Sequence, residues 1–558
     1  MKKHQFLALL VVLAMFTALL CSCGTTSNSS TKKDVPITAN NESFVPEGNL
    51  SDSCENTTDP ENAETIQVLP VEGDTLKLSL WKVWPPFLSN LDPTEAYEFR
   101  YLEKLVNVKM QVKTVGTDGS DETFNLMVAS GDLTDLIESG ATLYSGGGTK
   151  AIEDGIFYDL ADYLPVYAPD YYDIMINDSI GSRALVDADG KISQMMGFYD
   201  VPMVLARGLW IRQDWLDEQG LHQPGTLDEL THVLEVFRDE YGTKDAYAMR
   251  DDCEALITTA FDAHSDWYVL NGKVTYGKTE DSYCEYLSTL HDWYVNGLFS
   301  SDFVTANDST APLSAMILAG ETGVVNADKT LISDLFAADT SGSINVQPIA
   351  PITKNAGDQI YNQFISTRLL TSSTVVISTG CEYPEIAVAY MNECFKQENK
   401  MAMNYGEEGV TFEYDENGTP HYTELITNNP GIPGSFATLA YISPGIPYLR
   451  DFELYNSTYT YDAQLIADDV FSSKDNGDES QIFPDEYLTF TLEESEVISQ
   501  YEPELETYLN EMIAKFITGD ALLEHDFDGF VAELENTYGL SELNAVYQAA
   551  YDRFNGSK

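Results

Sequence analysis

Several tryptophan residues lie where the sequence predicts strand ends or a hairpin, and their rings are the first candidates for binding chemistry. Trp81 and Trp84 end a predicted strand beside Pro85-Pro86, Trp210 ends another, and Trp267 precedes a predicted hairpin. Ligand crevices in open α/β sheets lie at the carboxyl ends of the strands. A ring there can stack on the apolar face of a sugar while short polar groups bind its hydroxyls. We therefore predict that these four side chains contact a ligand.

Polar and tyrosine side chains at predicted loop positions are the other candidates. Arg212 follows the same strand as Trp210, although it could instead pair with Asp214 and cap the next helix. The segment from 430 to 448 contains four prolines and is predicted to be a surface loop over the mouth of the site. For every candidate the alternative is a purely structural role. The candidates of this kind are Tyr144, Arg212, Asp328, Tyr441 and Arg450.

Catalytic motifs do not accompany these residues. The 90 acidic residues offer carboxylate pairs throughout the chain, so carboxylates alone do not identify a glycosidase. The sequence contains no GxSxG, HExxH or GxxxxGK[ST] motif, and the run 146–148 lacks the context of a phosphate loop. We predict a binding protein without catalytic residues, with a secreted carbohydrate-active enzyme as the alternative.

The charge of the chain limits its partners. The formal net charge is −60, and binding to nucleic acid or anionic lipid requires patches of Lys and Arg. We therefore predict no nucleic-acid partner, and the same negative field disfavours a polyanionic sugar relative to a neutral one. No tandem repeat of the kind found in adhesins is visible.

The cysteines predict neither a disulfide framework nor a metal site. Beyond the N-terminal segment they number five, and none has the spacing of a zinc site. Cys381 and Cys394 could form a disulfide, or both could be buried free thiols. The five are Cys54, Cys253, Cys284, Cys381 and Cys394. We predict no metal and no cofactor.

The N-terminal segment is typical of an exported lipoprotein. A short basic stretch precedes an apolar run over 6–20, which is too short to span a bilayer. The run ends at Leu20-Cys21-Ser22-Cys23, the pattern called a lipobox, so residues 1–22 would be removed and Cys23 acylated. Residues 23–70 are predicted to be a disordered tether. The chain would then be anchored on the outer face of the membrane, and ordinary secretion is the alternative.

Alternating strands and helices must position these residues. Strands are predicted over 75–81 and 108–115 with a helix over 94–106 between them, and a short strand over 135–138 follows a helix over 122–129. Thr226 and Glu229 predict a capping box, and Asn271-Gly272 predicts a hairpin turn. Helices are predicted over 282–295, 503–518 and 527–538. Trp215 and Trp293 have helical core spacing and are expected to be buried.

Six segments carry a resemblance to a known family across about 430 residues. The chain resembles family 1 of the extracellular solute-binding proteins, specifically the long lipoprotein branch that serves ABC importers. The segments are Leu126-Met127-Val128-Ala129-Ser130-Gly131-Asp132-Leu133, Leu209-Trp210-Ile211-Arg212-Gln213-Asp214-Trp215-Leu216, Pro224-Gly225-Thr226-Leu227-Asp228-Glu229-Leu230, 287–303, Asn404-Tyr405-Gly406-Glu407-Glu408-Gly409-Val410, and 512–519 with 547–554.

The resemblance implies a two-lobed α/β fold of the periplasmic-binding-protein type, class II, with crossover hinge strands and the ligand between the lobes. It places the first lobe at 71–205 and 374–430 and the second at 206–373. A helical part at 431–558 would pack on the second lobe and the hinge. The implied partners are an oligosaccharide and the transmembrane subunits of an ABC permease, with the protein acting as a monomer.

Two points limit what the resemblance implies. Some members of this branch bind calcium in a loop after the helix equivalent to 227–241, but the stretch 241–246 lacks the spaced oxygen ligands that calcium requires. The scaffold also hosts several classes of cargo, so a peptide or another small solute remains an alternative to a sugar.

Overall fold

The structure of the 558-residue chain is a computed structural model. It describes residues 66–556 except 118, 204–206, 250–253, 301–302, 304–309, 340, 362–366, 430, 433, 444, 460 and 476–479. The predicted signal peptide, Cys23, most of the tether, Cys54 and Cys253 lie outside the described residues. Within the described part of the chain, none of the helices combines the length and apolarity that a bilayer span requires.

A six-stranded sheet forms the core of the first lobe. Its strand order is β14-β4-β11-β3-β1-β2, and β1, β2 and β3 run parallel while β11 runs antiparallel to β3 and β4. The strands are β1 (Leu76–Val83), β2 (Val108–Val115), β3 (Leu136–Glu138), β4 (Met195–Met203), β11 (Thr367–Ile377) and β14 (Leu449–Arg450). The predicted strand–helix–strand unit at the start of the chain is therefore confirmed.

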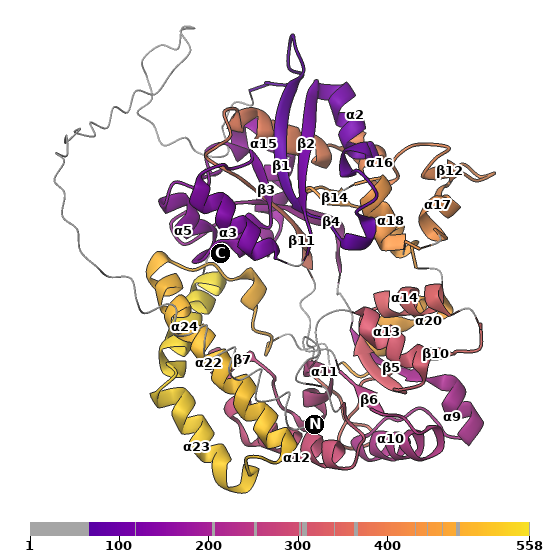
Figure 1. Cartoon of the computed structure of the whole chain (residues 1–558). Helices are drawn as coiled ribbons and strands as arrows, with labels where there is room; N and C mark the ends of the chain where they lie inside the picture. The colour runs from indigo at the N-terminus through magenta and orange to yellow at the C-terminus, as the bar shows by residue number, and fades with distance from the viewer. Residues whose placement is uncertain are drawn as a thin grey trace, which may run out of the picture. The chain divides into compact units, whose positions relative to one another are not determined.

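Helices cover this sheet (Figure 1). Leu78, Leu80 and Phe99 from the strand β1 and the helix α2 share one apolar core. The helices of the first lobe are α2 (Tyr97–Val106), α3 (Ser120–Ser130), α4 (Gly140–Leu143), α5 (Gly147–Glu153), α6 (Leu164–Tyr167), α7 (Pro169–Asn177), α8 (Gly181–Ala184), α15 (Pro384–Asn392), α16 (Lys400–Asn404), α17 (Glu424–Thr427), α18 (Gly434–Tyr441) and α19 (Phe452–Asn456). A small hairpin of β12 (Phe412–Tyr414) and β13 (Pro420–Tyr422) adjoins them.

A four-stranded sheet in the order β10-β5-β9-β6 forms the second lobe. Its strands are β5 (Gly208–Arg212), β6 (Tyr247–Ala248), β9 (Val324–Ala327) and β10 (Val346–Ile349), and every residue of β5 is buried. The helices are α9 (Gln213–Gln219), α10 (Leu227–Tyr241), α11 (Ala255–Thr258), α12 (Asp281–Val295), α13 (Thr310–Ala319), α14 (Thr330–Ala338), α20 (Asp462–Leu465) and α21 (Ala467–Phe471).

Local signals in the second lobe form as predicted. Thr226 and Glu229 make the reciprocal capping box at the start of α10. A hairpin of β7 (Trp267–Leu270) and β8 (Lys273–Tyr276) turns at Asn271 and Gly272, both with positive φ, as a type I′ turn requires. Trp215 and Trp293 are buried in the core of this lobe, as expected.

Three helices end the chain: α22 (Leu492–Thr518), α23 (Leu523–Asn536) and α24 (Leu540–Gly556). Leu509 and Phe530 from these helices share a core with Leu234 of α10 and Leu290 of α12. Figure 1 shows α22 and α23 beside α12. The predicted start of α22 at Pro503 is wrong, because the helix begins eleven residues earlier at Leu492, behind a capping box of Thr491 and Glu494, and Pro503 lies inside it.

The segment 430–448 also differs from its prediction as a surface loop. It contains the helix α18, whose Ala437 is fully buried, and Ile442 and Ile446 beyond it are buried as well. The strand β14 then pairs with β4 in the first sheet. The first lobe therefore continues past the predicted boundary at residue 430.

Candidate ligand-binding site

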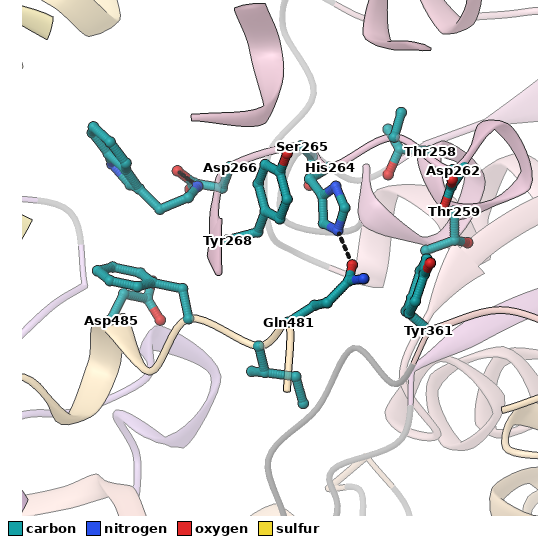
Figure 2. A pocket seen from close by; sticks show the side chains of 14 residues that line it. Thr258, Thr259, Asp262, His264, Ser265, Asp266, Tyr268, Tyr361, Gln481 and Asp485 are labelled. Carbon is teal, nitrogen blue, oxygen red and sulfur yellow. Dashed lines mark hydrogen bonds between the residues drawn. The ribbon is translucent and has the colours of Figure 1, made fainter. Parts of the chain in front are cut away.

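A cavity of about 190 Å³ lies where three segments of the chain meet, and we call it the second-lobe cavity. Most of its lining comes from residues 258–268, between α11 and β7, and the rest comes from Tyr361 and residues 481–485 (Figure 2). Aromatic rings, hydroxyls, an imidazole, an amide and carboxylates all contribute. This mixture suits a ligand that has both apolar faces and many hydroxyls.

The backbone of 258–268 presents its side chains through two local features. After α11 and a short 3-10 helix, Asp262 has φ 57°, which reverses the chain toward β7. Gly277 then lies against this loop: its N–H donates to the Asp266 carbonyl at 3.0 Å. A Cβ at position 277 would lie 2.3 Å from the His264 carbonyl oxygen, so only glycine permits this approach.

The imidazole of His264 stacks on the phenol ring of Tyr268 inside this cavity. Gln481 Oε1 lies 3.1 Å from His264 Nε2, and as an acceptor it requires the hydrogen on Nε2 (Figure 2). Burial lowers the pKa of His264 below its usual 6.5, so the ring is neutral near pH 7. His264 Nδ1 is then a hydrogen-bond acceptor.

Two buried polar atoms of the lining have no hydrogen-bond partner among the described residues. They are His264 Nδ1 and Thr259 Oγ1. A buried polar atom without a partner costs about 1–3 kcal/mol. Hydroxyl groups of a ligand could satisfy both, because a sugar hydroxyl both donates and accepts.

Trp267 joins the second-lobe cavity to a neighbouring one. Its ring packs against Tyr276 and Tyr547, with centroids 4.8 Å away in each case. A second cavity of about 500 Å³, which we call the acidic cavity, also has Trp267 in its lining. The two share four lining residues: Ser265, Asp266, Trp267 and Asp485. Of the predicted site residues, Trp267 therefore lies on both.

The other predicted tryptophans lie in the cores. The exposed fractions of Trp81, Trp84 and Trp210 are 0, 4 and 0 %. Trp81 packs edge-on against Phe124, Trp84 Nε1 donates to the Leu88 carbonyl at 3.0 Å, and Trp210 Nε1 donates to the Ala327 carbonyl at 3.0 Å. These placements favour the structural alternative, and a contact with ligand stays a prediction.

Two further candidates make contacts that explain them without a ligand. Arg212 Nε and Nη2 donate to the two carboxylate oxygens of Asp214, at 2.9 and 2.6 Å. Its guanidinium also lies 4.2 Å from the ring centre of Trp215. Tyr144 donates to Asp154 Oδ2 at 2.8 Å. The pairing of Arg212 with Asp214, stated above as the alternative, is therefore present.

Arg450 lies among tyrosine side chains at the edge of the first sheet. Its Nε donates to the Tyr448 hydroxyl at 2.6 Å, and its guanidinium lies 5.0 Å from the ring centre of Tyr455. The Tyr455 and Tyr459 hydroxyls are 3.1 Å apart. Tyr441, the last residue of α18, instead packs against the apolar clusters below that helix.

The tyrosine pair leads from Arg450 toward the second sheet. Lys329, just after β9, has its ammonium 4.8 Å from the ring centre of Tyr459. Burial, and then Tyr455, raises the pKa of Tyr459, and the carboxylate of Asp328 contributes to the same shift. Arg450 and Asp328, 122 positions apart in the chain and predicted separately, therefore lie near opposite ends of one tyrosine pair.

Sequence reasoning missed most of the second-lobe cavity. Its central residues are His264, Tyr268, Tyr361 and Gln481. One local signal was available: four of the five residues from Asp262 to Asp266 are polar, and they stand directly before Trp267. No local signal indicates Gln481, which contacts His264 across 217 positions of the sequence.

Cysteines in the described residues are free. These are Cys284, Cys381 and Cys394. Of the two possibilities for Cys381 and Cys394, the structure shows free thiols, and both are buried.

Comparison with known proteins gives a consistent result. The family model for bacterial extracellular solute-binding proteins matches residues 91–401. Lipoprotein LipO of Bacillus subtilis is 23% identical over 515 residues, covering 88% of this chain and 95% of LipO. The fructooligosaccharide ABC transporter substrate-binding protein FusA of Streptococcus pneumoniae is 22% identical over 516 residues, covering 84% and 89%.

Solved structures show the same fold. The alginate-binding protein AlgQ2, solved without calcium, aligns with a TM-score of 0.69 at 23% identity, covering 86% of this chain and 98% of its own. FusA from S. pneumoniae in complex with kestose aligns with a TM-score of 0.69 at 20% identity, covering 86% and 100%. The predicted fold class is therefore confirmed.

Proposed function

The chain belongs to the bacterial extracellular solute-binding proteins, and from this we propose that it binds an oligosaccharide in the second-lobe cavity and delivers it to an ABC permease. The family model covers more than half of the sequence, and the long relatives match nearly all of it. The class of cargo and the partner are the parts that we propose.

One observation carries the choice of a carbohydrate. Thr259 Oγ1 and His264 Nδ1 are buried beside the stacked rings of His264 and Tyr268, and neither has a hydrogen-bond partner in the part of the chain that the structure describes. A sugar ring supplies both an apolar face for the aromatic surface and hydroxyls for these two atoms. A purely apolar ligand would leave both polar atoms unpaired.

The named cargoes of the relatives support this class. FusA is named for fructooligosaccharide, and a second relative from B. subtilis, YtcQ, is named a polygalacturonan/rhamnogalacturonan-binding protein. The cargoes differ among these proteins, so the relatives favour a carbohydrate without fixing which one. A peptide or another small solute is the alternative.

We propose two further features of the same function. Asp328 and Arg450, at the ends of the tyrosine pair, form a second set of contacts for a longer ligand. Acylated Cys23 holds the protein on the outer face of the membrane, where a permease can receive the cargo. We assign no catalytic role, and a bound oligosaccharide should be recovered uncleaved after prolonged incubation.

A thermal-shift screen of the mature chain against a glycan library tests the proposal. A ligand at 100 times its Kd stabilises the fold by about 2.7 kcal/mol, which raises the melting temperature measurably. The shift should disappear in His264→Ala. The matched control is Tyr538→Ala, which removes a ring stacked on Tyr508 at 4.3 Å outside both cavities. If no glycan stabilises the wild type and a peptide does, the carbohydrate assignment fails.

A further inference from the structure

The segment 481–491, which we call the interlobe strap, sends side chains into the cores of both lobes. Phe483 and Leu488 belong to the core of the second lobe, whereas Tyr487 belongs to the core of the first lobe. The exposed fractions of these three side chains are 7, 9 and 9 %, in that order along the pairs just named. Tyr487 and Leu488 follow one another at the end of the 3-10 helix η10 (Asp485–Tyr487), and yet they anchor the strap in different lobes.

The first residues of the strap form one wall of the second-lobe cavity. The strap contributes four of the residues that line this cavity, all between positions 481 and 485. Figure 2 shows Gln481 beneath the imidazole of His264, on the same stretch of chain as Asp485. The Gln481 carbonyl also accepts a hydrogen bond from the Val269 N–H of β7 at 3.0 Å. Main chain and side chain of Gln481 therefore both hold this wall against the loop that carries His264.

A second contact with the first lobe lies beside the strap, near the end of α24. Phe554 of this helix packs against the cores of both lobes. The guanidinium of Arg183, on α8 of the first lobe, lies 4.0 Å from the centre of the Phe554 ring, and its Nη1 donates to the Phe554 carbonyl at 3.1 Å. Arg553 Nη2 donates to the Thr489 carbonyl of the strap at 2.8 Å, and η10 itself contacts α8. The strap and the last helix thus meet the first lobe at the same helix.

The strap has little slack between the cavity and its anchor in the first lobe. Gln481 precedes Tyr487 by only six positions, and six residues span at most about 20 Å when fully extended. Pro484 lies between them, and its ring fixes one backbone angle. Leu488 then returns the chain to the core of the second lobe. Because packed cores transmit strain instead of absorbing it, a displacement of Tyr487 acts on the wall formed by Gln481.

We propose that Tyr487 is a positioning residue for the second-lobe cavity: its anchor in the first lobe holds the Gln481 wall in the arrangement that binds cargo. Tyr487 does not line the cavity, so it acts through the strap. The inference rests on the proposed function, because the cargo of this cavity is assigned there. It adds that the affinity of the cavity depends on the first lobe, even for a ligand that contacts second-lobe residues alone.

Hydrogen exchange of the ligand-free chain tests the coupling without any cargo. Tyr487→Ala should speed exchange of the Val269 amide about tenfold, because the Gln481 carbonyl that accepts its hydrogen bond loses its anchor. Tyr487→Phe keeps the ring in the first-lobe core and should exchange like wild type. The matched control is Tyr101→Ala, which removes a partly buried phenol ring from the same core at α2 and should leave Val269 unchanged.

Arg183→Gln provides an independent variant that leaves both apolar cores intact. It removes the cationic contact with the Phe554 ring, so it tests the coupling even if Tyr487→Ala fails to fold. Loss of this contact should speed exchange of the Val269 amide about fivefold.

Calorimetry measures the effect on binding, with the glycan that gives the largest thermal shift in the library screen as the probe. Tyr487→Ala should weaken binding of this glycan about tenfold, whereas Tyr487→Phe and Tyr101→Ala should stay within about threefold of wild type. Melting curves separate affinity from stability, because Tyr101→Ala should lower the melting temperature without changing the affinity.

Unchanged exchange of Val269 in folded Tyr487→Ala and in Arg183→Gln overturns the proposal, as does an equal increase in Tyr101→Ala. Wild-type affinity in Tyr487→Ala despite faster exchange also overturns it, because the wall would then move without consequence for the cargo. If no glycan binds the wild-type chain, the proposed carbohydrate function fails instead. The exchange rates then still decide whether Tyr487 positions the wall.

Discussion

The imidazole of His264 and the phenol ring of Tyr268 lie 3.7 Å apart between centroids, with only 8° between their planes. The stack holds His264 in an orientation in which Nε2 is within hydrogen-bond distance of Gln481 Oε1. Its Nδ1 has no partner among the described residues. The neutral ring is thus fixed as a hydrogen-bond acceptor in the wall of a cavity.

His264→Ala should weaken binding of the cognate glycan by about ten- to thirtyfold, because it removes an acceptor and half of the aromatic surface. Tyr268→Phe should stay within about threefold of wild type, because it keeps the stack and loses only the hydrogen bond from the Tyr268 hydroxyl to Glu280. Calorimetry measures both. Wild-type affinity in His264→Ala would remove this residue from the site.

Trp267 and Trp293 should respond differently to truncation. Trp267→Ala should weaken ligand binding by about 2 kcal/mol, or thirtyfold, while the apo chain still folds. Trp293 is 2 % exposed in the core. Trp293→Ala should instead lower the free energy of unfolding by about 3–5 kcal/mol, because alanine leaves a cavity. Trp81→Ala, Trp84→Ala and Trp210→Ala should resemble Trp293→Ala. A stable Trp81 variant with impaired binding would restore that residue to the site.

Glu98 should make the stability of the first lobe depend on pH. Its side chain is fully buried, and desolvation raises its pKa from 4.5 to about 8. The folded chain therefore holds this proton more tightly than the unfolded chain. The resulting contribution to the free energy of unfolding is complete below about pH 4.5 and is lost as the pH rises toward 8. It amounts to a few kcal/mol at most.

Glu98→Gln tests this dependence, since glutamine resembles the protonated carboxyl group at every pH. The melting temperature of the variant minus that of wild type should increase between pH 5 and pH 8. Glu407→Gln, a half-exposed partner of Arg100, is the control and should show no such increase. A flat difference for Glu98→Gln would mean that Glu98 is ionised in the folded chain.

Cys23→Ser should release the protein from the membrane fraction into the medium, because acyl chains on Cys23 are its proposed membrane hold. Cys21→Ser should leave the distribution unchanged, because the bulky Leu20 precedes it. Immunoblots of separated cell and medium fractions measure both. Retention of Cys23→Ser in the membrane would contradict the lipobox interpretation.

The sequence predicted elements whose signals are local. The capping box of Thr226 and Glu229 and the turn at Asn271-Gly272 depend on neighbours within a few residues, and both form. The start of α22 was predicted wrongly because Pro503 is common in a first helical turn but is here tolerated inside the helix. A local rule cannot distinguish these two cases.

The site depended on information that the sequence does not display locally. The ends of β1 and β5 were found, but strand position alone does not reveal that Trp81 packs against Phe124 of α3 and Trp210 against Phe471 of α21, where both are buried. Trp267 was identified because it precedes the hairpin. His264 and Gln481 become neighbours only when the fold brings together positions 217 residues apart.

The close approach of Gly277 to the His264 carbonyl links the proposed site to a residue that lines neither cavity. A single methyl group at position 277 would push the loop that carries His264, Asp266 and Trp267. Substitution at Gly277, directly after the β7–β8 hairpin, is therefore restrained by its effect on this loop. Exchange of the whole hairpin with that of a relative could retune cargo preference, provided that the glycine is inherited with it.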